Sequence, residues 1–443
     1  MKLYNTLTNT KEELKPIKEG TISMYCCGPT VYNYVHIGNV RNMVVFDVLR
    51  RTLEYQGYHV EQMVNFTDVD DKIIKRAKEE GVSEAEITEK YIKAYNDVRH
   101  GMHVLMPTYT PRVTENMGAI IDFIDDLVQK GSAYEVDGDV YFDVEHSKYY
   151  GELSKNTIEE LKVGARVDEN EKKHSPLDFA LWKAMNEGLR WDSPWGMGRP
   201  GWHTECVVMI HNQFKGEIDI HMGGVDLKFP HHENEIAQSR ALHGHAIAHT
   251  WIHNAMLNID GEKMSKSMAN GLLANDMIEL HGGNVLRWML MSTHYRLALN
   301  FTDEVMDNAR KEIDKILTPL KQLAIKGQLA DQTNNGEYNK EEMTDFINAL
   351  NDDLNISNAM SIVYEKVKEL NQLLRVREID FVKAYDKANV LMKMLEILGI
   401  EVPSIVLTEE DKELYAKWNQ AKSEKDFEAA DTYRNQLIKR GVM

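Results

Sequence analysis

The chain has 443 residues and a hydrophobic fraction of 43%, a composition ordinary for a folded protein and a length sufficient for two to four domains. The sequence has no run of about 18 apolar residues, which a membrane-spanning helix would need. The first residues, MKLYNTLTNT, lack the pattern of a signal peptide. Three cysteines and a net charge of −18 argue against a disulfide framework and against a basic surface over the whole molecule. We therefore expect a cytoplasmic protein, although a basic face can coexist with an acidic remainder.

The first hundred residues alternate strand patterns with helical patterns. TISMYCCGPTVY, residues 21–32, predicts a strand that runs into a turn, and residues 40–57 predict a helix that ends near Gly57. YHVEQMVNFTDVDD, residues 58–71, predicts a second strand and a loop. This order of strand, loop, helix and strand is typical of a parallel sheet covered by helices, so we expect an α/β fold.

The next hundred residues differ and predict an insertion between two halves of this sheet. Residues 133–144, AYEVDGDVYFDV, predict a hairpin, and residues 190–202 are rich in turn signals. Strand and helix patterns return at 217–242 and 246–261. From about 301 onward Gly and Pro are rare and apolar residues recur at helical spacing, which predicts an α-helical bundle and a last, short helical segment.

The stretch DLKFPHHENEIAQSR, residues 226–240, suggests a metal site. If a helix begins near Pro230, His231 and Glu235 share one face, while His232 and Glu233 point elsewhere. The zinc-protease pattern H-E-x-x-H does not apply, because Ile236 stands where the second histidine is needed. A histidine and a glutamate alone are more often a helix start with surface charge, so further ligands are required.

The cysteines can supply these ligands. Cys26 and Cys27 lie where the first strand ends, and Cys206 lies in the middle of the chain. Ligands at the carboxyl ends of parallel strands converge above the sheet. One early and one middle cysteine with a histidine and a glutamate would suit Zn²⁺. The alternative is that the cysteines are small buried hydrophobic residues.

Two short segments predict nucleotide binding. VHIGNVR, residues 35–41, places His36 and a glycine at the start of the first helix, where backbone amides favour a phosphate. GEKMSKSMAN, residues 261–270, places Lys263 and Lys266 in a loop of small residues. Each signal is weak alone, but the pair in this order strongly indicates a polyphosphate site.

HIGN together with KMSKS resembles the ATP-binding signature of class I aminoacyl-tRNA synthetases. MYCCGPTVYNYVHIGN, NFTDVDDKI, GRPGWHTEC and FPHHENEIAQS narrow the resemblance to the cysteinyl-tRNA synthetase family, over nearly the whole chain. The fourth position of the first motif is Asn39 where the family pattern has histidine. Asparagine still offers a donor, so we expect altered detail and not lost function.

The resemblance implies an enzyme that activates L-cysteine with ATP and transfers it to the 3′ end of tRNA(Cys). It implies one Zn²⁺ that selects the substrate thiol, Mg²⁺ bound with ATP, and these zinc ligands: Cys27, Cys206, His231 and Glu235. Cys26 is then a packing residue. The implied catalytic residues are His36, Asn39, Lys263 and Lys266, and the implied ATP-binding residues are the same four with Gly38, Gly223, Gly224 and Asp226. The implied cysteine-binding residues are Thr30, Thr67, Trp202 and His203, and the implied anticodon contacts are Phe427, Asp431 and Arg434.

The resemblance also implies a division of the chain. We expect a Rossmann-type catalytic domain in two halves at 1–100 and 201–258, an insertion (connective) domain at 101–200, the KMSKS loop and tRNA stem-contact region at 259–302, an anticodon-side helical bundle at 303–402, and a truncated C-terminal anticodon-recognition segment at 403–443. We expect a monomer, since no exposed apolar heptad stands out.

Two alternatives remain open. A cysteine ligase of mycothiol-type synthesis resembles the same catalytic domain but uses an amino-sugar acceptor. The long helical region after the KMSKS segment favours tRNA. A non-catalytic relative that binds nucleic acid is the other alternative, and the intact lysines and H-x-G turn argue against it.

Overall fold

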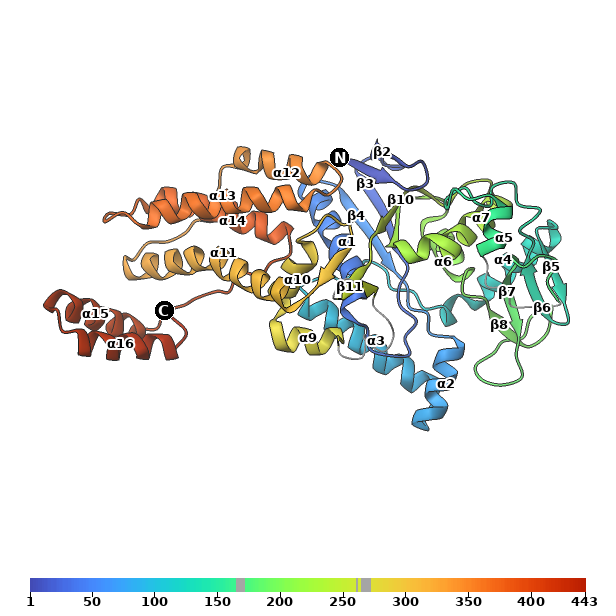
Figure 1. The fold of residues 1–443 in the computed structure, drawn as a ribbon, viewed down its shortest axis with the longest axis horizontal. Helices are drawn as coiled ribbons and strands as arrows, with labels where there is room; N and C mark the ends of the chain where they lie inside the picture. The colour runs from blue at the N-terminus through green and yellow to red at the C-terminus, as the bar shows by residue number, and fades with distance from the viewer. Residues whose placement is uncertain (165–171, 260–261, 264–271) are drawn as a thin grey trace.

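A computed structural model gives the fold and describes residues 1–164, 172–259, 262–263 and 272–443. The molecule is elongated, with a strand-rich region at one end, a parallel sheet in the middle and helices at the other end (Figure 1). Within the described residues, no helix is both long enough and apolar enough to span a membrane.

The central sheet has four parallel strands in the order β10 (Ala248–Asn254), β9 (Ile218–Gly224), β3 (Thr21–Cys26) and β4 (His59–Val64). Successive side chains of a strand point to opposite faces. Met24 therefore packs with α1 (Ile37–Tyr55) on one face, whereas Tyr25 packs with α4 (Met117–Gln129), α6 (Glu205–Phe214) and α7 (Glu233–His243) on the other. The predicted Rossmann-type parallel sheet is confirmed.

The segment between β4 and β9 contains a second sheet. After α2 (Asp71–Glu80) and α3 (Glu84–Gly101), the antiparallel strands β5 (Ala133–Val136), β6 (Asp139–Phe142), β7 (Phe179–Ala184) and β8 (Gly198–Pro200) follow one another. The expected hairpin is present: Asp137 and Gly138 join β5 to β6, and both have positive φ, as a two-residue hairpin turn with the twist of its strands requires.

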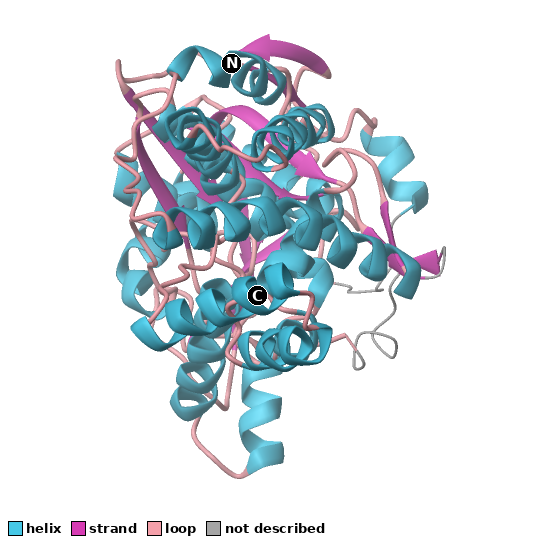
Figure 2. Cartoon of the chain, turned by 90° about the vertical axis from the view of Figure 1, so that its left-hand side faces the viewer, coloured by secondary structure: helices cyan, strands magenta, loops and turns pink. Residues whose placement is uncertain are grey.

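The chain after the central sheet is mainly helical, as predicted. A small sheet of β11 (Leu257–Ile259), β12 (Glu262–Lys263) and β13 (Leu299–Phe301) precedes α11 (Asp303–Leu329), α12 (Thr344–Asn351), α13 (Ile356–Leu374) and α14 (Phe381–Ile397). Seen from this end, these helices lie in front of the central sheet (Figure 2). The remaining elements are β1 (Lys2–Asn5), β2 (Thr10–Glu13), η1 (Thr114–Asn116), α5 (Ile158–Gly164), η2 (Val225–Leu227), η3 (Lys228–His232), α9 (Ala274–His281), α10 (Gly283–Met291), η4 (Lys340–Met343), α15 (Glu409–Glu424) and α16 (Phe427–Lys439).

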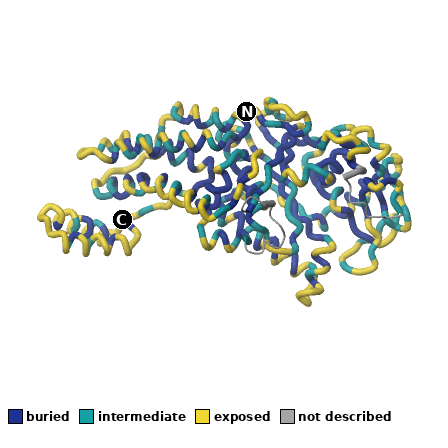
Figure 3. The backbone as a smooth tube through the Cα atoms, in the orientation of Figure 1, coloured by how far each residue is buried: buried dark blue, intermediate teal, exposed yellow. Residues whose placement is uncertain are grey.

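One hydrophobic core joins the central sheet to the helical region. Residues of α1, α10, α11, α13 and α14 belong to a single buried cluster. Inside it, Arg287 of α10 forms an ion pair with Asp47 of α1, and its Nη1 donates to the Met102 carbonyl at 3.0 Å. The α15–α16 hairpin has a separate, smaller core and a largely exposed surface (Figure 3). The helical bundle is therefore fixed to α1, which covers the central sheet, and the hairpin is an appendage.

Candidate active site and metal centre

The end of β3 positions the first cysteine of the site. Gly28 donates its backbone N–H to Asn65 Oδ1 at 2.7 Å, next to the end of β4. A Cβ at position 28 would lie 1.6 Å from the Asn65 carbonyl oxygen, so only glycine permits this approach. The contact holds the ends of β3 and β4 together. Cys27 consequently lies at the carboxyl edge of the sheet, where open α/β folds bind ligands.

The structure brings together the four residues expected to bind zinc. The Cys27 and Cys206 Sγ atoms are 3.8 Å apart, and Cys27 Sγ lies 3.5 Å from Glu235 Oε1. His231 Nε2 lies 3.7 Å from Cys206 Sγ and 2.9 Å from Glu235 Oε1. One ligand atom from each residue lies within 4.8 Å of the others. Cys206 begins the first turn of α6, whereas His231 and Glu235 flank the start of α7.

These separations fit a tetrahedral ion. Zn–S bonds of about 2.3 Å and Zn–N bonds of about 2.0 Å place two sulfur atoms about 3.8 Å apart, and sulfur and nitrogen about 3.5 Å apart. The sulfur–sulfur and sulfur–nitrogen distances of the cluster agree with these values to about 0.2 Å. Thiolate, imidazole and carboxylate together are also a donor set that suits Zn²⁺. The residues present therefore fit this metal.

Further histidines surround the cluster, and among them the sequence did not reveal His221. His221 Nε2 lies 2.7 Å from Glu235 Oε2, and His203 Nδ1 lies 2.9 Å from His231 Nδ1. The expectation that His232 points away is wrong, because its Nε2 lies 3.5 Å from Cys27 Sγ. It does so because residues 228–232 form a wide turn before α7, whereas a regular helix from Pro230 would turn His232 aside. Glu233 does point elsewhere and accepts backbone N–H bonds from Gly151, Leu153 and Ser154.

The charges within the cluster are those that a cation requires. Burial raises the pKa of Cys27, whereas the hydrogen bond from Cys27 lowers the pKa of Cys206 to about 6. Burial also raises the pKa of Glu235, but His221 and His231 outweigh it and hold this pKa well below its usual range. Burial lowers the pKa of His231, but Glu235 and Cys206 raise it to about 10. A thiolate and a carboxylate thus outweigh one positive imidazole, and a bound cation would replace the proton of that imidazole.

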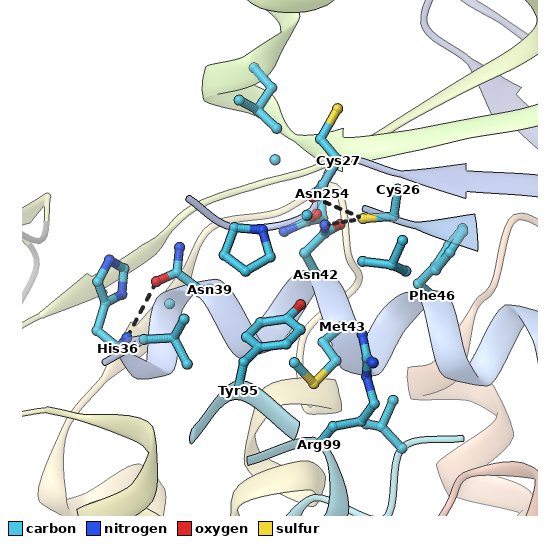
Figure 4. A pocket seen from close by; sticks show the side chains of 18 of the residues that line it. Cys26, Cys27, His36, Asn39, Asn42, Met43, Phe46, Tyr95, Arg99 and Asn254 are labelled. Atoms are coloured by element: carbon cyan, nitrogen blue, oxygen red, sulfur yellow. Dashed lines mark hydrogen bonds between the residues drawn. The ribbon is translucent and has the colours of Figure 1, made fainter. Parts of the chain in front are cut away.

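The start of α1 presents donors to an adjoining cavity. His36 occupies the N-cap position, and its backbone N–H donates to Asn39 Oδ1 at 3.3 Å (Figure 4). The Asn39 side chain therefore helps to begin the helix. His36 Nδ1 is buried and has no hydrogen-bond partner among the described residues. Burial lowers the pKa of His36, and the smaller, opposite effect of the Asp226 charge does not cancel this. The imidazole is therefore neutral at neutral pH.

The cavity has a volume of about 940 Å³. It is lined by the expected zinc ligand Cys27 and by these residues expected to bind ATP or cysteine: Thr30, His36, Gly38, Asn39, Gly224 and Asp226. Gly223 is not among its lining residues; a Cβ there would lie 2.7 Å from the His232 ring. Lys266 lies outside the described residues, and only the backbone of Lys263 is described, in β12.

The described residues on either side of the KMSKS motif lie beside the start of α1. β12 pairs with β11, and on the other side Ile37 donates its N–H to the Leu272 carbonyl at 3.0 Å. Ala274 donates in turn to the Val35 carbonyl at 2.9 Å. The fold thereby places Leu272 and Ala274, which follow the KMSKS segment in the sequence, at the start of α1.

Three of the four residues expected to bind cysteine contact a member of the four-donor cluster or its sequence neighbour Glu205. Trp202 is 42% exposed and stacks on His231 with ring centroids 4.2 Å apart, so it is not a core residue. The Thr67 hydroxyl donates to Glu205 Oε2 at 2.9 Å, and Thr30 bridges the Thr67 backbone. Burial raises the pKa of Glu205 well above its usual range, as does the nearby Cys206. Glu205, missed from sequence, is therefore a buried acid beside the cluster.

The three expected anticodon residues lie on α16, far from this site along the molecule (Figure 1). Phe427, Asp431 and Arg434 are all exposed. Their spacing of four and three residues places them on one face of the helix. The geometry leaves this face open to a partner.

The comparisons with known proteins identify the family. Residues 13–311 match the family described as tRNA synthetases class I (C) catalytic domain, and residues 345–402 match the DALR domain. The chain belongs to the class I tRNA synthetase family. Among curated members, the cysteine–tRNA ligase of Clostridioides difficile is 45% identical over all of this chain and 97% of its own length. That of Bacillus cereus is 44% identical over all of this chain and 96% of its own length.

Solved synthetase structures share the fold. Methionyl-tRNA synthetase from Mycobacterium tuberculosis, bound by methionyl-adenylate, has a TM-score of 0.62 at 11% identity, over 94% of this chain and 96% of its own. A putative arginyl-tRNA synthetase from Campylobacter jejuni has a TM-score of 0.58 at 14% identity, over 87% of this chain and 94% of its own. The DALR match covers all but the first residue of α12 and all of α13 and α14. None of these relatives supports the amino-sugar ligase alternative.

Proposed function

We propose that this chain is a cysteine–tRNA ligase, which activates L-cysteine with ATP and transfers the cysteinyl group to the 3′ end of tRNA(Cys). One observation carries the proposal: a four-donor cluster adjoins a cavity that reaches the start of α1. Cys27 belongs to both, because it lines the cavity and supplies a sulfur to the cluster. A bound amino acid can therefore contact the cluster with its side chain while its carboxylate faces the nucleotide.

We further propose that Cys27, Cys206, His231 and Glu235 hold one zinc ion. Serine differs from cysteine by a single atom, and an apolar pocket separates such near-isosteres by only about 1–3 kcal/mol. The ion supplies a site that coordinates a thiolate far better than an alcohol. Trp202 and His203 contact His231, Thr30 lines the cavity, and Thr67 pairs with Thr30, so we propose that these residues position the amino acid.

The start of α1 supplies the nucleotide contacts in this proposal. The unpartnered His36 Nδ1, the Asn39 amide and the helix dipole favour phosphate oxygens. Asp226 and the adjacent Gly224, which line the same cavity, suit a ribose and its hydroxyls. Lys263 and Lys266 would neutralise the charge that develops on the departing pyrophosphate, and Mg²⁺ would arrive with ATP. Attack of the cysteine carboxylate on the α-phosphorus then needs alignment more than a protein base.

The acceptor is tRNA in this proposal. The DALR match over the helical bundle and the exposed face of Phe427, Asp431 and Arg434 on α16 support it. All three cysteines are free, which agrees with the reducing cytoplasm where tRNA is charged. We expect the protein to act as a monomer, which its molar mass in solution will test.

Attachment of labelled cysteine to total bacterial tRNA, with ATP and Mg²⁺, tests this function. The same preparation should catalyse cysteine-dependent exchange of pyrophosphate into ATP without added tRNA. Exchange without charging, combined with cysteine transfer to an amino sugar, would favour the ligase alternative. Absence of both exchange and charging would refute the enzymatic proposal.

A further inference from the structure

The cavity extends well beyond the start of α1. His36, Asn39, Asn42, Met43 and Phe46 all line it and follow one another along one face of that helix (Figure 4). His36 and Phe46 are ten residues apart, or about 15 Å along the helix axis. The residues expected to bind phosphate lie at one end of this path. The other end, which we name the inner chamber, is lined by Asn42, Met43 and Phe46 of α1, Tyr95 and Arg99 of α3, and Leu105.

A buried arginine without a charge partner lies in the inner chamber. Arg99 is 2% exposed and rises from α3 towards Met43 and Phe46 (Figure 4). Its Nη1 donates to Asn96 Oδ1 at 3.3 Å, and its guanidinium lies 5.0 Å from the centre of the Tyr95 ring. Its Nε has no hydrogen-bond partner among the described residues, and no described carboxylate forms an ion pair with it. A buried charge is normally paired, because desolvation costs several kcal/mol.

The contrast with Arg287 shows what is missing at Arg99. Arg287 is also fully buried, but it forms an ion pair with Asp47 and donates to the carbonyl oxygens of Met102 and Leu398. These partners satisfy the buried charge of Arg287, so it has a structural role. Arg99 has an open space before it where Arg287 has a carboxylate. An anion from solution can fill the corresponding place.

The remaining walls define what else such a ligand would carry. Met43, Phe46 and Tyr95 offer apolar surface. Towards the nucleotide end, Asn42 and the buried Asn254 each have an Oδ1 atom with no partner among the described residues. Asn42 Nδ2 is engaged by Cys26 Sγ at 2.8 Å, which fixes its orientation. The chamber thus combines one cation with apolar surface, and two hydrogen-bond acceptors lie towards the nucleotide end of the cavity.

We propose that the inner chamber binds a small organic anion, whose carboxylate pairs with Arg99 and whose apolar body packs against Met43, Phe46 and Tyr95. Guanidinium and carboxylate match in geometry and form strong, charge-assisted hydrogen bonds. The ligand is separate from ATP and cysteine, because Arg99 lies beside Met43 and Phe46, about two to three helical turns along α1 from His36 (Figure 4). It can therefore be bound at the same time as both substrates.

Titration of the full chain with benzoate tests the proposal, with its uncharged analogue benzamide and with hexanoate as a flexible carboxylate. We expect benzoate or hexanoate to bind with a Kd on the order of 1 mM, and benzamide to bind at least about tenfold more weakly. Saturating ATP and L-cysteine should change the Kd by less than about twofold. Binding is measured by calorimetry or by ligand-detected NMR.

Matched variants assign the binding to Arg99. We expect Arg99→Gln to weaken benzoate binding at least about tenfold and Arg99→Lys to retain most of it. Arg190→Gln, at an exposed arginine outside the cavity, should bind like the unaltered chain. Thermal unfolding and pyrophosphate exchange do not depend on anion binding in the chamber, so they show whether each variant is folded and active.

Several results would overturn the proposal. They are no binding of either carboxylate, equal binding of benzamide, unchanged binding by a folded Arg99→Gln variant, and displacement of benzoate by ATP. The last result would assign the chamber to the nucleotide site. None of them bears on tRNA charging, so this proposal and the proposed function fail separately.

Discussion

The four-donor cluster and the start of α1 adjoin one cavity but are built in opposite ways. In the cluster, Cys206, His231 and Glu235 are at most 2% exposed, and each faces a second protein group. At the start of α1, His36 leaves a ring nitrogen without a protein partner. The cluster is assembled from three distant parts of the sequence, whereas the helix start is a single short segment.

The difference follows from the ligand that each region would hold. A resident ion with fixed geometry benefits from donors that are oriented in advance by their neighbours. A nucleotide that binds and leaves with every turnover needs donors that are free when it arrives. Variants of the cluster should therefore affect metal content, and variants of the nucleotide region should change the kinetics of the reaction without changing metal content.

The largest expected effect is at the cluster itself. We expect Cys206→Ala to lose the zinc and to lower cysteine-dependent pyrophosphate exchange by about 10³-fold or more, because one of only two sulfur donors is removed. Cys26→Ala, at the neighbouring cysteine outside the cluster, is the matched control and should keep its zinc. Metal analysis of both purified proteins makes the measurement. Full zinc content in Cys206→Ala would contradict the assignment of this ligand.

The next largest effect should be a slower reaction with unchanged zinc content. We expect Lys266→Ala to slow pyrophosphate exchange by about 10²–10³-fold, since a charge that stabilises the departing pyrophosphate is lost. Its zinc content should equal that of the unaltered chain, which separates the two regions directly. A normal exchange rate would remove Lys266 from the mechanism.

A smaller effect is expected at His221, which orients the proposed zinc ligand Glu235. His221 Nε2 lies 2.7 Å from Glu235 Oε2, so we expect His221→Ala to weaken zinc affinity by about 10–100-fold without abolishing it. Competition with a calibrated chelator measures this affinity. The His221 ring stacks on Trp251, so His221→Ala leaves a cavity beside Trp251. His221→Phe fills this space without a ring nitrogen and should be measured as well. Unaltered affinity in both variants would mean that the contact does not support the metal.

The smallest effect is a dependence on pH at the start of α1. The pKa of His36 is lowered by burial, so the imidazole is neutral at pH 7 and gains a proton only as the pH falls through this lowered pKa. A positive imidazole attracts phosphate more strongly, so the KM for ATP should decrease by about fivefold as the pH falls. In His36→Gln this dependence should be absent, whereas protonation of ATP affects both proteins alike. An identical pH profile in the variant would exclude contact between His36 and ATP.

The sequence was sufficient for the elements that local patterns determine. The strand before Cys27, the helix that starts at the H-x-G turn and the Asp137–Gly138 hairpin follow from apolar periodicity and turn residues, and the structure contains all three. The fourfold donor set came from the resemblance, and the structure brings its members together.

Long-range contacts were beyond such reasoning. His221 lies in the middle of β9 and reads as part of a strand, yet the pairing of β9 with β3 and β10 directs it to Glu235. His232 reaches Cys27 because a wide turn precedes α7, which the i to i+4 pattern does not predict. Arg99 belongs to a charged helix in the sequence, and only the packing of α3 beside α1 reveals it as a buried cavity residue.

The preference for cysteine over serine tests the central claim most directly. The zinc-loaded chain should be assayed for pyrophosphate exchange with each amino acid, and the two values of kcat/KM compared. If the buried cluster selects the thiol through a metal, the ratio should exceed about 10³, because an apolar pocket alone provides only about 10–200-fold. A ratio within that lower range would contradict selection by the cluster.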